Sequence, residues 1–501
     1  MGAETRVGKQ HARGSALYFL VAAVLFIPLA WMFGVFLPDQ PANRDVWQAA
    51  AAIKALIDNP WSPTNPFIAA GDSSRHFQPY WLSLALIARS HGLDHLSTLG
   101  LAAYFSLTVM AVGIFVFARA YWTSRWAPLI LLLTMVLGWL LPLIHTGFHS
   151  PLTLLHGAAY PATLLIGLTL ILWASAIHAL NRTWFTIVIF GLAALMFTTH
   201  QLGAAIGFIG AACLAALHGN STLRTRGVIL ASMLAGIAVS ALWPYHNPIA
   251  LVLVGSTSSW DGGPNFYGLT FMSAALIPSA LGLIGLIMMR ENRAMLAAFA
   301  LYFALYLTGL LGIQIAARFL MPAVLVLHIG LAAIIIESLV GEARDRIIRP
   351  QFILAAVPVF ALTLALVLWR YGDSGIETAE DSLSPYAAAI RLTDDIAGDR
   401  PIAAYSIAVW PIVATGQRAY SVPWPEPAIR DLSQRQQANR QLFDPALARQ
   451  QRQQLASDMG VRFVFVDVRY VPSSVFDALE RQASASEQAG FYVRFDLSAG
   501  E

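Results

Sequence analysis

Residues 38–80 read PDQPANRDVWQAAAAIKALIDNPWSPTNPFIAAGDSSRHFQPY and separate the first long apolar segment from the rest of a hydrophobic chain. In a chain of 501 residues that is only 12% charged, this stretch gathers eight ionisable side chains: Asp39, Arg44, Asp45, Lys54, Asp58, Asp72, Arg75 and His76. Loops that connect rigid elements often carry binding and catalytic residues. We therefore expect this first loop to organise the function of the chain.

The composition around this loop places the chain among polytopic membrane proteins, because hydrophobic residues make up 57% of it. A helix needs about 20 apolar residues to cross the hydrocarbon core. Eleven segments approach that requirement: 15–37, 95–119, 125–144, 157–179, 183–199, 202–218, 227–243, 269–289, 294–316, 318–338 and 351–370. The sequence therefore predicts a helical membrane domain with about eleven spans.

Basic residues in the short connections predict the orientation of these spans. Lys and Arg are enriched in cytoplasmic loops, and here they occupy alternate connections, from Arg6, Lys9 and Arg13 onward. This pattern predicts a cytoplasmic N-terminus, a retained first span and a C-terminal domain outside the cytoplasm. We expect a multi-pass protein of a bacterial inner membrane. The net charge of +3 comes from loop arginines, so no nucleic-acid partner is expected.

The acidic residues divide the chain into two domains. Of the 28 Asp and Glu residues, 17 follow Arg370, which predicts a membrane domain over 1–370 and a soluble domain over 371–501. Alternating patterns in the second range predict a small α/β domain. Its expected helices are 384–397, 427–441, 444–458 and 474–484, and its expected strands are 401–406, 418–422, 462–467 and 490–496. No nucleotide-binding or hydrolase motif occurs there, so we assign it no chemistry.

Two short helices are expected within the first loop. Apolar residues recur at helical spacing between Val46 and Ile57, which predicts an amphipathic helix lying on the membrane surface and ending before Pro60. A turn-rich segment follows, and a second short helix begins at Pro79. Together these interfacial helices would form a lid over the outer membrane face.

The expected outer side holds few carboxylates before Arg370: Asp39, Asp45, Asp58, Asp72, Asp94 and Asp261. Asp45 stands where the first loop helix begins, so it is either an ordinary helix cap or a general base that removes an acceptor's proton. Asp72 forms a compact polar group with Arg75 and His76. That group is either a turn with a local ion pair or a second carboxylate with acceptor-binding partners.

Arg318 is the candidate cation. It lies between two apolar runs at the expected outer end of a span, where basic residues are disfavoured. Its guanidinium group could bind a phosphate at the level of the lipid headgroups. The alternatives are an arginine that snorkels to the interface or one that pairs with Asp261.

Histidine and aromatic residues mark further outer loops. His145, His149 and His156 are interpreted as solvated or hydrogen-bonding residues rather than as a metal site. His200 ends a span and could line a cavity, while Tyr245, His246 and Asp261 belong to a loop suited to stacking on sugars. Interfacial aromatic residues are common, so membrane anchoring is the alternative. A single cysteine, Cys213, excludes zinc-cysteine sites, and neither a metal nor a cofactor is expected.

Taken together, these features resemble the GT-C superfamily of polytopic glycosyltransferases, which use polyprenyl-phosphate-linked sugars. The superfamily includes protein O-mannosyltransferases, aminoarabinose transferases and bacterial members with a C-terminal extracytoplasmic domain. The resemblance covers nearly the whole chain and rests on these segments: RDVWQAAAAIKAL, SSRHFQPYW, FTTHQLGA, WPYHNP, AARFLMPAVLVLHIGLA and GVRFVFVDVRY.

The resemblance implies a GT-C-like helical membrane domain, a C-terminal extracytoplasmic α/β domain and an inverting sugar transfer to a lipid, glycan or protein acceptor. Asp45 would be the catalytic aspartate of the first loop, and Arg318 would bind the donor phosphate. An adjacent pair of acids, common in some families, is absent, which leaves the base open between Asp45 and Asp72. The residues expected to bind substrate are Arg75, His76, His200, Tyr245, His246 and Asp261.

Two other classes of function compete with this interpretation. A transporter or flippase of lipid-linked sugars would be expected to show inverted repeats with broken spans and midplane charges. The sequence shows no internal repeat, and its outer charges gather at the interface, which favours an enzyme. A non-catalytic envelope assembly protein would use the outer α/β domain to bind partners.

Overall fold

The computed structural model describes residues 2–36, 45–69, 73–139, 145, 147–254, 263–288, 292–340, 383–396, 400–424, 426 and 429–498. The chain forms two compact units. One, here called the helical unit, consists of Met1–Phe33, Ala102–Trp243 and Pro248–Ile376. The other, called the mixed unit, consists of Gly34–Leu101, Pro244–Asn247 and Glu377–Glu501.

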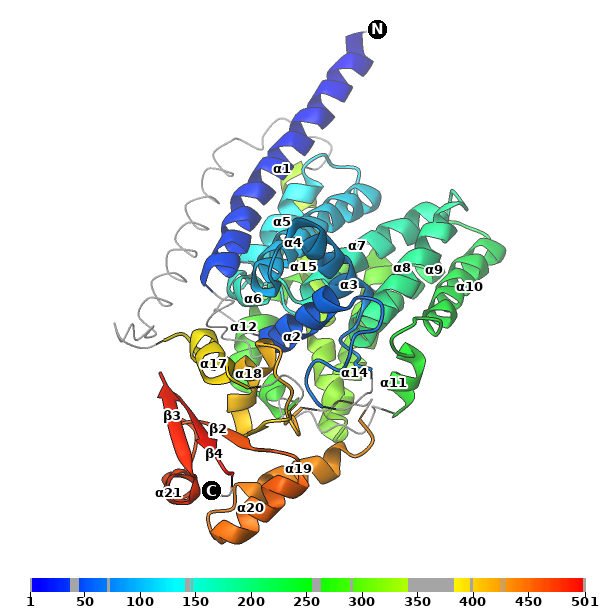
Figure 1. The fold of residues 1–501 in the computed structure, drawn as a ribbon. Coiled ribbons are helices and arrows are strands. Elements are labelled where there is room, and N and C mark those ends of the chain that lie inside the picture. Colours follow the sequence, from blue (N-terminus) through cyan, green and yellow to red (C-terminus); the bar gives the residue numbers. More distant parts are fainter. Residues whose placement is uncertain are drawn as a thin grey trace. The chain divides into compact units, whose positions relative to one another are not determined.

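The helical unit is built from α-helices and short 3-10 helices (Figure 1). Its elements are α1 (Gly2–Phe36), α4 (His95–Tyr121), α5 (Ala127–Leu137), α6 (Pro151–Gly157), α7 (Pro161–Ala179), α8 (Phe185–Thr199), α9 (Gln201–Leu217), α10 (Leu223–Ser240), α11 (Pro248–Val254), η2 (Gly263–Tyr267), α12 (Leu269–Ser279), α13 (Leu281–Met288), α14 (Arg293–Thr308), η4 (Gly309–Leu311), η5 (Gln314–Phe319) and α15 (Leu320–Val340). Helix α7 packs against α8 and α9, and α15 packs against α5, α13 and α14.

Six of the described helices are long and apolar enough to cross a membrane, and a seventh span results if α12 and α13, which meet at 44°, count as one. The expected number of about eleven spans stays a prediction. Helices α5, α8 and α9 are apolar but have 10–17 residues. The backbone of His200 is extended and divides α8 from α9. The expected span 351–370 lies outside the described residues.

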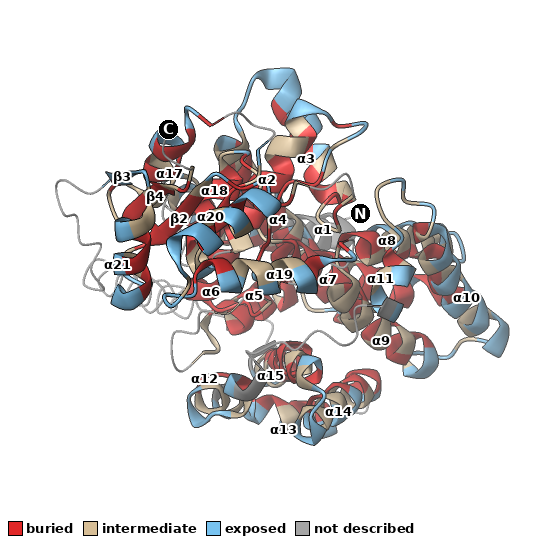
Figure 2. Cartoon of the chain, turned by 60° about the horizontal axis from the view of Figure 1, so that its bottom comes forward, coloured by how far each residue is buried: buried red, intermediate tan, exposed pale blue. Residues whose placement is uncertain are grey.

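Apolar side chains on the outside of the helical unit fit a lipid environment. Figure 2 shows exposed residues along α10 and α13, and large apolar side chains are among them, including Leu234 and Ile287. A soluble protein rarely exposes so many large apolar groups on one surface. Together with the candidate spans, these surfaces identify a multi-pass membrane protein.

Glycine allows two pairs of these helices to approach closely. A Cβ atom on Gly113 of α4 would meet the backbone of Gly167 in α7. In the same way, a Cβ atom on Gly282 of α13 would meet the backbone of α15 at Leu327. Small residues at such crossings let backbones pack against one another where lipid provides no hydrophobic driving force.

The mixed unit contains a four-stranded sheet of order β1-β2-β4-β3. Its helices are α2 (Asp45–Asp58), α3 (Pro79–His91), α17 (Pro385–Thr393), η6 (Ser406–Ala408), α18 (Val409–Ala414), α19 (Leu432–Leu442), α20 (Arg449–Asp458) and α21 (Ser473–Gln482). Its strands are β1 (Ala403–Ala404), β2 (Phe463–Asp467), β3 (Ala485–Ala489) and β4 (Tyr492–Asp496). β1 runs parallel to β2, and the other pairs are antiparallel.

Side chains alternate between the two faces of this sheet, as the pleat requires. Val464 and Val466 of β2 pack on one face with residues of α19, α20 and α21. Phe465, between them, packs on the opposite face with α17 and α18. The sheet is therefore the middle layer between two groups of helices.

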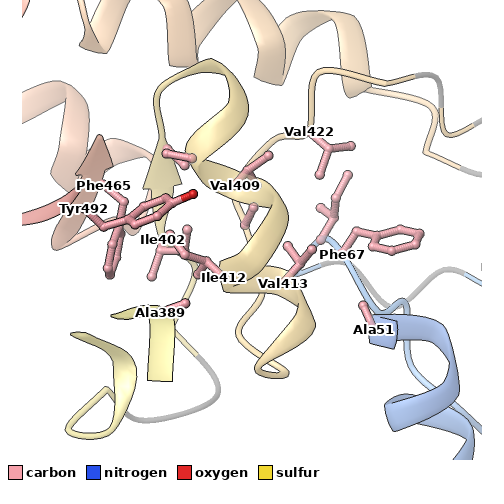
Figure 3. Packing of buried hydrophobic residues seen from close by; sticks show 14 of the residues in the cluster. Ala51, Phe67, Ala389, Ile402, Val409, Ile412, Val413, Val422, Phe465 and Tyr492 are labelled. Atoms are coloured by element: carbon pink, nitrogen blue, oxygen red, sulfur yellow. The ribbon is translucent and has the colours of Figure 1, made fainter. Parts of the chain in front are cut away.

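The first loop supplies part of this core. Phe67, Ile68 and Ala51 belong to the same buried cluster as α17 and α18, and Figure 3 shows Phe67 and Ala51 beside Val413. Ile68 also forms a parallel bridge with Ala419, which bridges in turn to Ile402 next to β1. The loop thus extends the edge of the sheet.

Helix α2 is covered by protein on most of its surface, because it packs against α3 and α18. Its first and last residues match the sequence prediction, whereas its expected place on the membrane surface and the expected lid remain predictions. In the C-terminal range, the expected strand 418–422 is reduced to the bridges at Ala419. Strand β3 and helix α18 were not predicted from the sequence. The ranges 1–370 and 371–501 stay a prediction for the functional domains.

Candidate functional site

A buried carboxyl group joins the first loop to the C-terminal part of the mixed unit. The side chain of Glu426 is 1% exposed. Its Oε1 accepts hydrogen bonds from the Ser74 hydroxyl at 3.3 Å and from the Arg75 amide at 3.4 Å. Its Oε2 lies 4.0 Å from Nε2 of His76. The tight turn at Ser74–His76 therefore holds three groups around one acid.

Several polar atoms of this cluster have no hydrogen-bond partner within the described part of the chain. They are Oε2 of Glu426, Nε2 of His76, both ring nitrogens of His246 and Nε1 of Trp424. A distance of 4.0 Å is too long for a direct hydrogen bond between Glu426 and His76. Buried polar atoms in folded proteins are usually satisfied, so these atoms mark a place for a bound polar molecule or water.

The loop 244–247 brings His246 to this cluster. The Tyr245 hydroxyl donates a hydrogen bond to the Pro60 carbonyl, and the Tyr245 carbonyl accepts one from the Ser73 hydroxyl. The Tyr245 ring also contacts Phe77 edge-on, with 6.0 Å between ring centroids. These contacts hold the 244–247 loop against both ends of the turn-rich segment of the first loop.

Burial controls the charges of the cluster. It raises the pKa of the Glu426 carboxyl, although the nearby Arg75 charge partly opposes this. It lowers the pKa of His76 well below its ordinary value, and the charges of Arg75 and His246 add to the effect. It lowers the pKa of His246 to about 4. An ion pair between Glu426 and His76 would lower the pKa of Glu426 and raise that of His76, which is the opposite of both shifts. Because the pKa values of His76 and His246 are lowered, both imidazoles are neutral near pH 7.

Aromatic rings form one side of the cluster. Phe67 contacts His76 and Trp424 edge-on, with centroid distances of 5.0 and 5.4 Å. Trp424 in turn lies 4.2 Å from the ring centroid of Trp410. This apolar side limits water access and explains the strong effect of burial on the neighbouring pKa values.

Asp45 begins helix α2 and is half-buried. A carboxylate in the first turn of a helix is favoured by the positive end of the helix dipole, so the capping interpretation and the catalytic one both fit this position. The helix itself is held by protein on most sides. Asp45 is therefore presented from a rigid element.

Arg318 and His200 belong to the helical unit. Arg318 is half-buried in η5, directly before α15, and η5 packs against η2 and α14. His200 caps α9, because its Nδ1 accepts a hydrogen bond of 2.9 Å from the Gly203 amide. Capping gives His200 a structural role, and its expected substrate contact stays a prediction.

A second histidine group lies in the helical unit. Nε2 of His149 is 2.8 Å from Nδ1 of His328, and both residues are buried. The Trp139 ring contacts both imidazoles. No group of three His, Cys, Asp or Glu side chains suited to a metal ion occurs among the described residues, and the expectation of a metal-free site stays a prediction.

The structure brings together only some of the expected site residues. Arg75, His76, Tyr245 and His246 share the Glu426 cluster, whereas Asp72 and Asp261 lie outside the described residues. Sequence reasoning missed Glu426. Its signal in the sequence was an acid between two prolines, in VPWPEPA.

Comparison with known proteins shows similarity at the level of the fold. No protein-family model and no curated protein sequence matches the chain. Among solved structures, the chain is similar to the oligosaccharyltransferase of Archaeoglobus fulgidus in its apo form, with a TM-score of 0.53 and 12% identity over 94% of this chain and 71% of that one. The archaeal oligosaccharyltransferase AglB in complex with an inhibitory peptide and a dolichol-phosphate gives the same values.

A further match, the mycobacterial arabinofuranosyltransferase AftD, has a TM-score of 0.46 and 16% identity over 92% of this chain and 40% of that one. A TM-score of this size does not establish a shared fold. The match to the archaeal enzyme shows that the chain has a GT-C-like fold, as the sequence resemblance implied. The chain therefore shares the fold of that oligosaccharyltransferase.

Proposed function

We propose that the chain is an inverting membrane glycosyltransferase that moves a sugar from a polyprenyl-phosphate donor to an acceptor outside the cytoplasm. The observation that carries this proposal is the fold, which 94% of the chain shares with an oligosaccharyltransferase. A structure of that enzyme contains a dolichol-phosphate, which is a lipid phosphate, together with a peptide. Donor and acceptor of this chain would have the same general nature: a lipid-linked sugar and a lipid, glycan or protein.

The proposed reaction forms a bond between the acceptor oxygen and the anomeric carbon while the bond from that carbon to the phosphate oxygen breaks. Asp45, or alternatively Asp72, accepts the proton of the acceptor hydroxyl. Arg318 binds the phosphate, which leaves with the lipid and gains negative charge as it does so. The residues proposed to position the substrates are Arg75, His76, His200, Tyr245, His246 and Asp261.

Local structure supports these roles. Asp45 lies on a helix whose packing against α3 and α18 fixes its position, and a general base must be held within hydrogen-bond reach of its proton. Arg318 lies directly before a long apolar helix, in a short element that packs against η2 and α14. A guanidinium group in such a place can present two parallel donors to a phosphate.

A transfer assay tests the proposal. Purified protein is incubated with a panel of radiolabelled polyprenyl-phosphate sugars and a membrane extract as acceptor. Wild-type protein should transfer at least one sugar, and Asp45→Asn or Asp72→Asn should reduce the rate roughly 10²–10⁴-fold with an unchanged unfolding temperature. Asp58→Asn is the matched control, because Asp58 is exposed on the same helix. Full activity in both variants would remove this mechanism.

We further propose that the N-terminus is cytoplasmic and the C-terminal part extracytoplasmic. With Cys213 replaced by alanine, the chain contains no cysteine, so single cysteines can report their side of the membrane. A membrane-impermeant maleimide should label Ser474→Cys in cells with a permeable outer layer and an intact inner membrane. Asn181→Cys should react only after detergent is added. The opposite labelling pattern would reverse the proposed orientation.

A further inference from the structure

Several buried polar atoms around Glu426 have no hydrogen-bond partner within the described part of the chain. Glu426 is almost fully buried, and its Oε2 faces Nε2 of His76 across 4.0 Å with neither atom hydrogen-bonded in the described structure. A ligand hydroxyl that reached both atoms would donate a hydrogen bond to the carboxyl oxygen and accept one from the imidazole, which would satisfy both groups.

His246 adds further hydrogen-bonding capacity to the cluster. It follows Tyr245, which is hydrogen-bonded to Ser73 and contacts Phe77, and both ring nitrogens of His246 lack a hydrogen-bond partner among the described residues. A neutral imidazole offers one donor and one acceptor. The cluster therefore matches neighbouring hydroxyl groups, such as those of a sugar ring, better than one isolated hydroxyl.

The charges of the cluster disfavour a phosphate. The free Oε2 of Glu426 would repel an anion, and the two imidazoles contribute no positive charge near pH 7 because burial keeps them neutral. Arg75 lies beside the carboxyl that it partly neutralises. The site is thus suited to a neutral, polyhydroxylated molecule and not to the charged end of a lipid-linked donor.

We infer that Glu426, His76 and His246 bind the hydroxyl groups of a neutral sugar acceptor. This inference rests on the proposed function and assigns the cluster to the acceptor side of that reaction. It also gives the C-terminal part of the mixed unit a direct role in substrate recognition, because Glu426 comes from that part and His76 comes from the first loop.

Ligand-observed saturation-transfer NMR tests the inference with the full-length protein in detergent. The probes are methyl glycosides of common hexoses and pentoses, a serine- and threonine-rich peptide, and inorganic phosphate. Wild-type protein should bind at least one glycoside, and Glu426→Gln, which preserves the shape of the side chain, should weaken that binding about tenfold or more. His76→Ala should have a similar effect. Glu480→Gln and His91→Gln, at exposed positions, are the matched controls.

Phosphate should not displace the glycoside. Unchanged glycoside binding in both Glu426→Gln and His76→Ala would overturn the inference, and so would a change in thermal stability alone, because ordered water would then satisfy these atoms. Weakened binding of the peptide without any effect on glycosides would also refute a sugar ligand.

The transfer assay separates this inference from the proposed function. Transfer with an unchanged acceptor KM in Glu426→Gln would refute the acceptor site but not the glycosyltransferase activity. Glycoside binding that depends on Glu426, without any transfer, would refute the glycosyltransferase activity but not the binding site.

Discussion

The backbone amide of Ala419 donates a hydrogen bond of 2.7 Å to the carbonyl oxygen of Phe67. The Ala69 amide donates one of 3.3 Å to the Ala419 carbonyl, so the first loop and the C-terminal sheet share a short ladder. The Phe67 side chain continues this connection into the core, where it contacts Trp424. The first loop therefore belongs to the mixed unit by its packing as well as by its backbone hydrogen bonds.

Replacing Phe67 with alanine should destabilise the mixed unit strongly. The side chain is fully buried, and truncation of a buried phenylalanine costs about 3–5 kcal/mol. Thermal unfolding of the purified protein measures the effect. Trp61→Ala is the matched control, because Trp61 lies in the same loop and is 78% exposed. Equal stability of the two variants would contradict the packing described for Phe67.

A fragment containing only residues 383–498 should not unfold cooperatively. Its core would lack Ala51, Phe67 and Ile68, which belong to the buried cluster on one face of the sheet. Linking residues 45–101 to the fragment should restore a sharp transition in urea. The comparison uses near-ultraviolet circular dichroism as the readout. A cooperative transition in the shorter fragment would show that the loop is dispensable for this core.

Arg318→Lys and Arg318→Ala should separate charge from geometry in donor binding. Lysine keeps the positive charge but loses the planar pair of donors, so we expect an intermediate rise in the donor KM for lysine and a larger one for alanine. A rise of about tenfold or more for alanine fits the loss of a charge-assisted hydrogen bond. Arg293→Lys, at an exposed position, serves as control. An unchanged donor KM in both Arg318 variants would remove Arg318 from the donor site.

His246 should make the stability of the mixed unit depend on pH. Its pKa is about 4 in the folded protein because of burial, against an ordinary value of 6.5. Between these values the unfolded chain binds a proton that the folded chain does not, so its contribution is complete above pH 6.5 and is lost as the pH falls towards 4.

In His246→Asn the unfolding temperature should therefore decline less steeply between pH 6.5 and 4, by an amount that corresponds to about 1–3 kcal/mol. Some dependence should remain, because burial also lowers the pKa of His76 in the folded protein. Thermal unfolding from pH 4 to 7.5 checks this, with His91→Asn as an exposed control. Identical slopes for wild type and His246→Asn would show that His246 is not buried in solution.

Local patterns were sufficient to predict much of the fold. Long apolar segments predicted the helices near 95–119 and 318–338, because membrane insertion depends mainly on length and hydrophobicity. The alternation in VRFVFVD predicted strand β2. Strand β3 could not be predicted in the same way, because its sequence ASEQA is polar and small and it pairs only with β4. Its conformation depends on its partner and not on its own residues.

The site was only partly predictable for a related reason. The polar group at Arg75 and His76 was visible in the sequence as a cluster of neighbours. Glu426 lies 352 residues beyond Ser74, to which it is hydrogen-bonded, and no local pattern connects positions so distant. The burial that sets the charges of this cluster also arises only from tertiary packing.

The ladder between Phe67 and Ala419 also sets an order of events during biosynthesis. A ribosome that adds about 5–20 residues per second needs tens of seconds to progress from one partner to the other, since Thr64 and its hydrogen-bonded partner Arg418 are 354 residues apart. During that time the apolar side chains of the early segment have no sheet to cover. The nascent protein must therefore keep this segment from aggregating or pairing wrongly until the last quarter of the chain arrives.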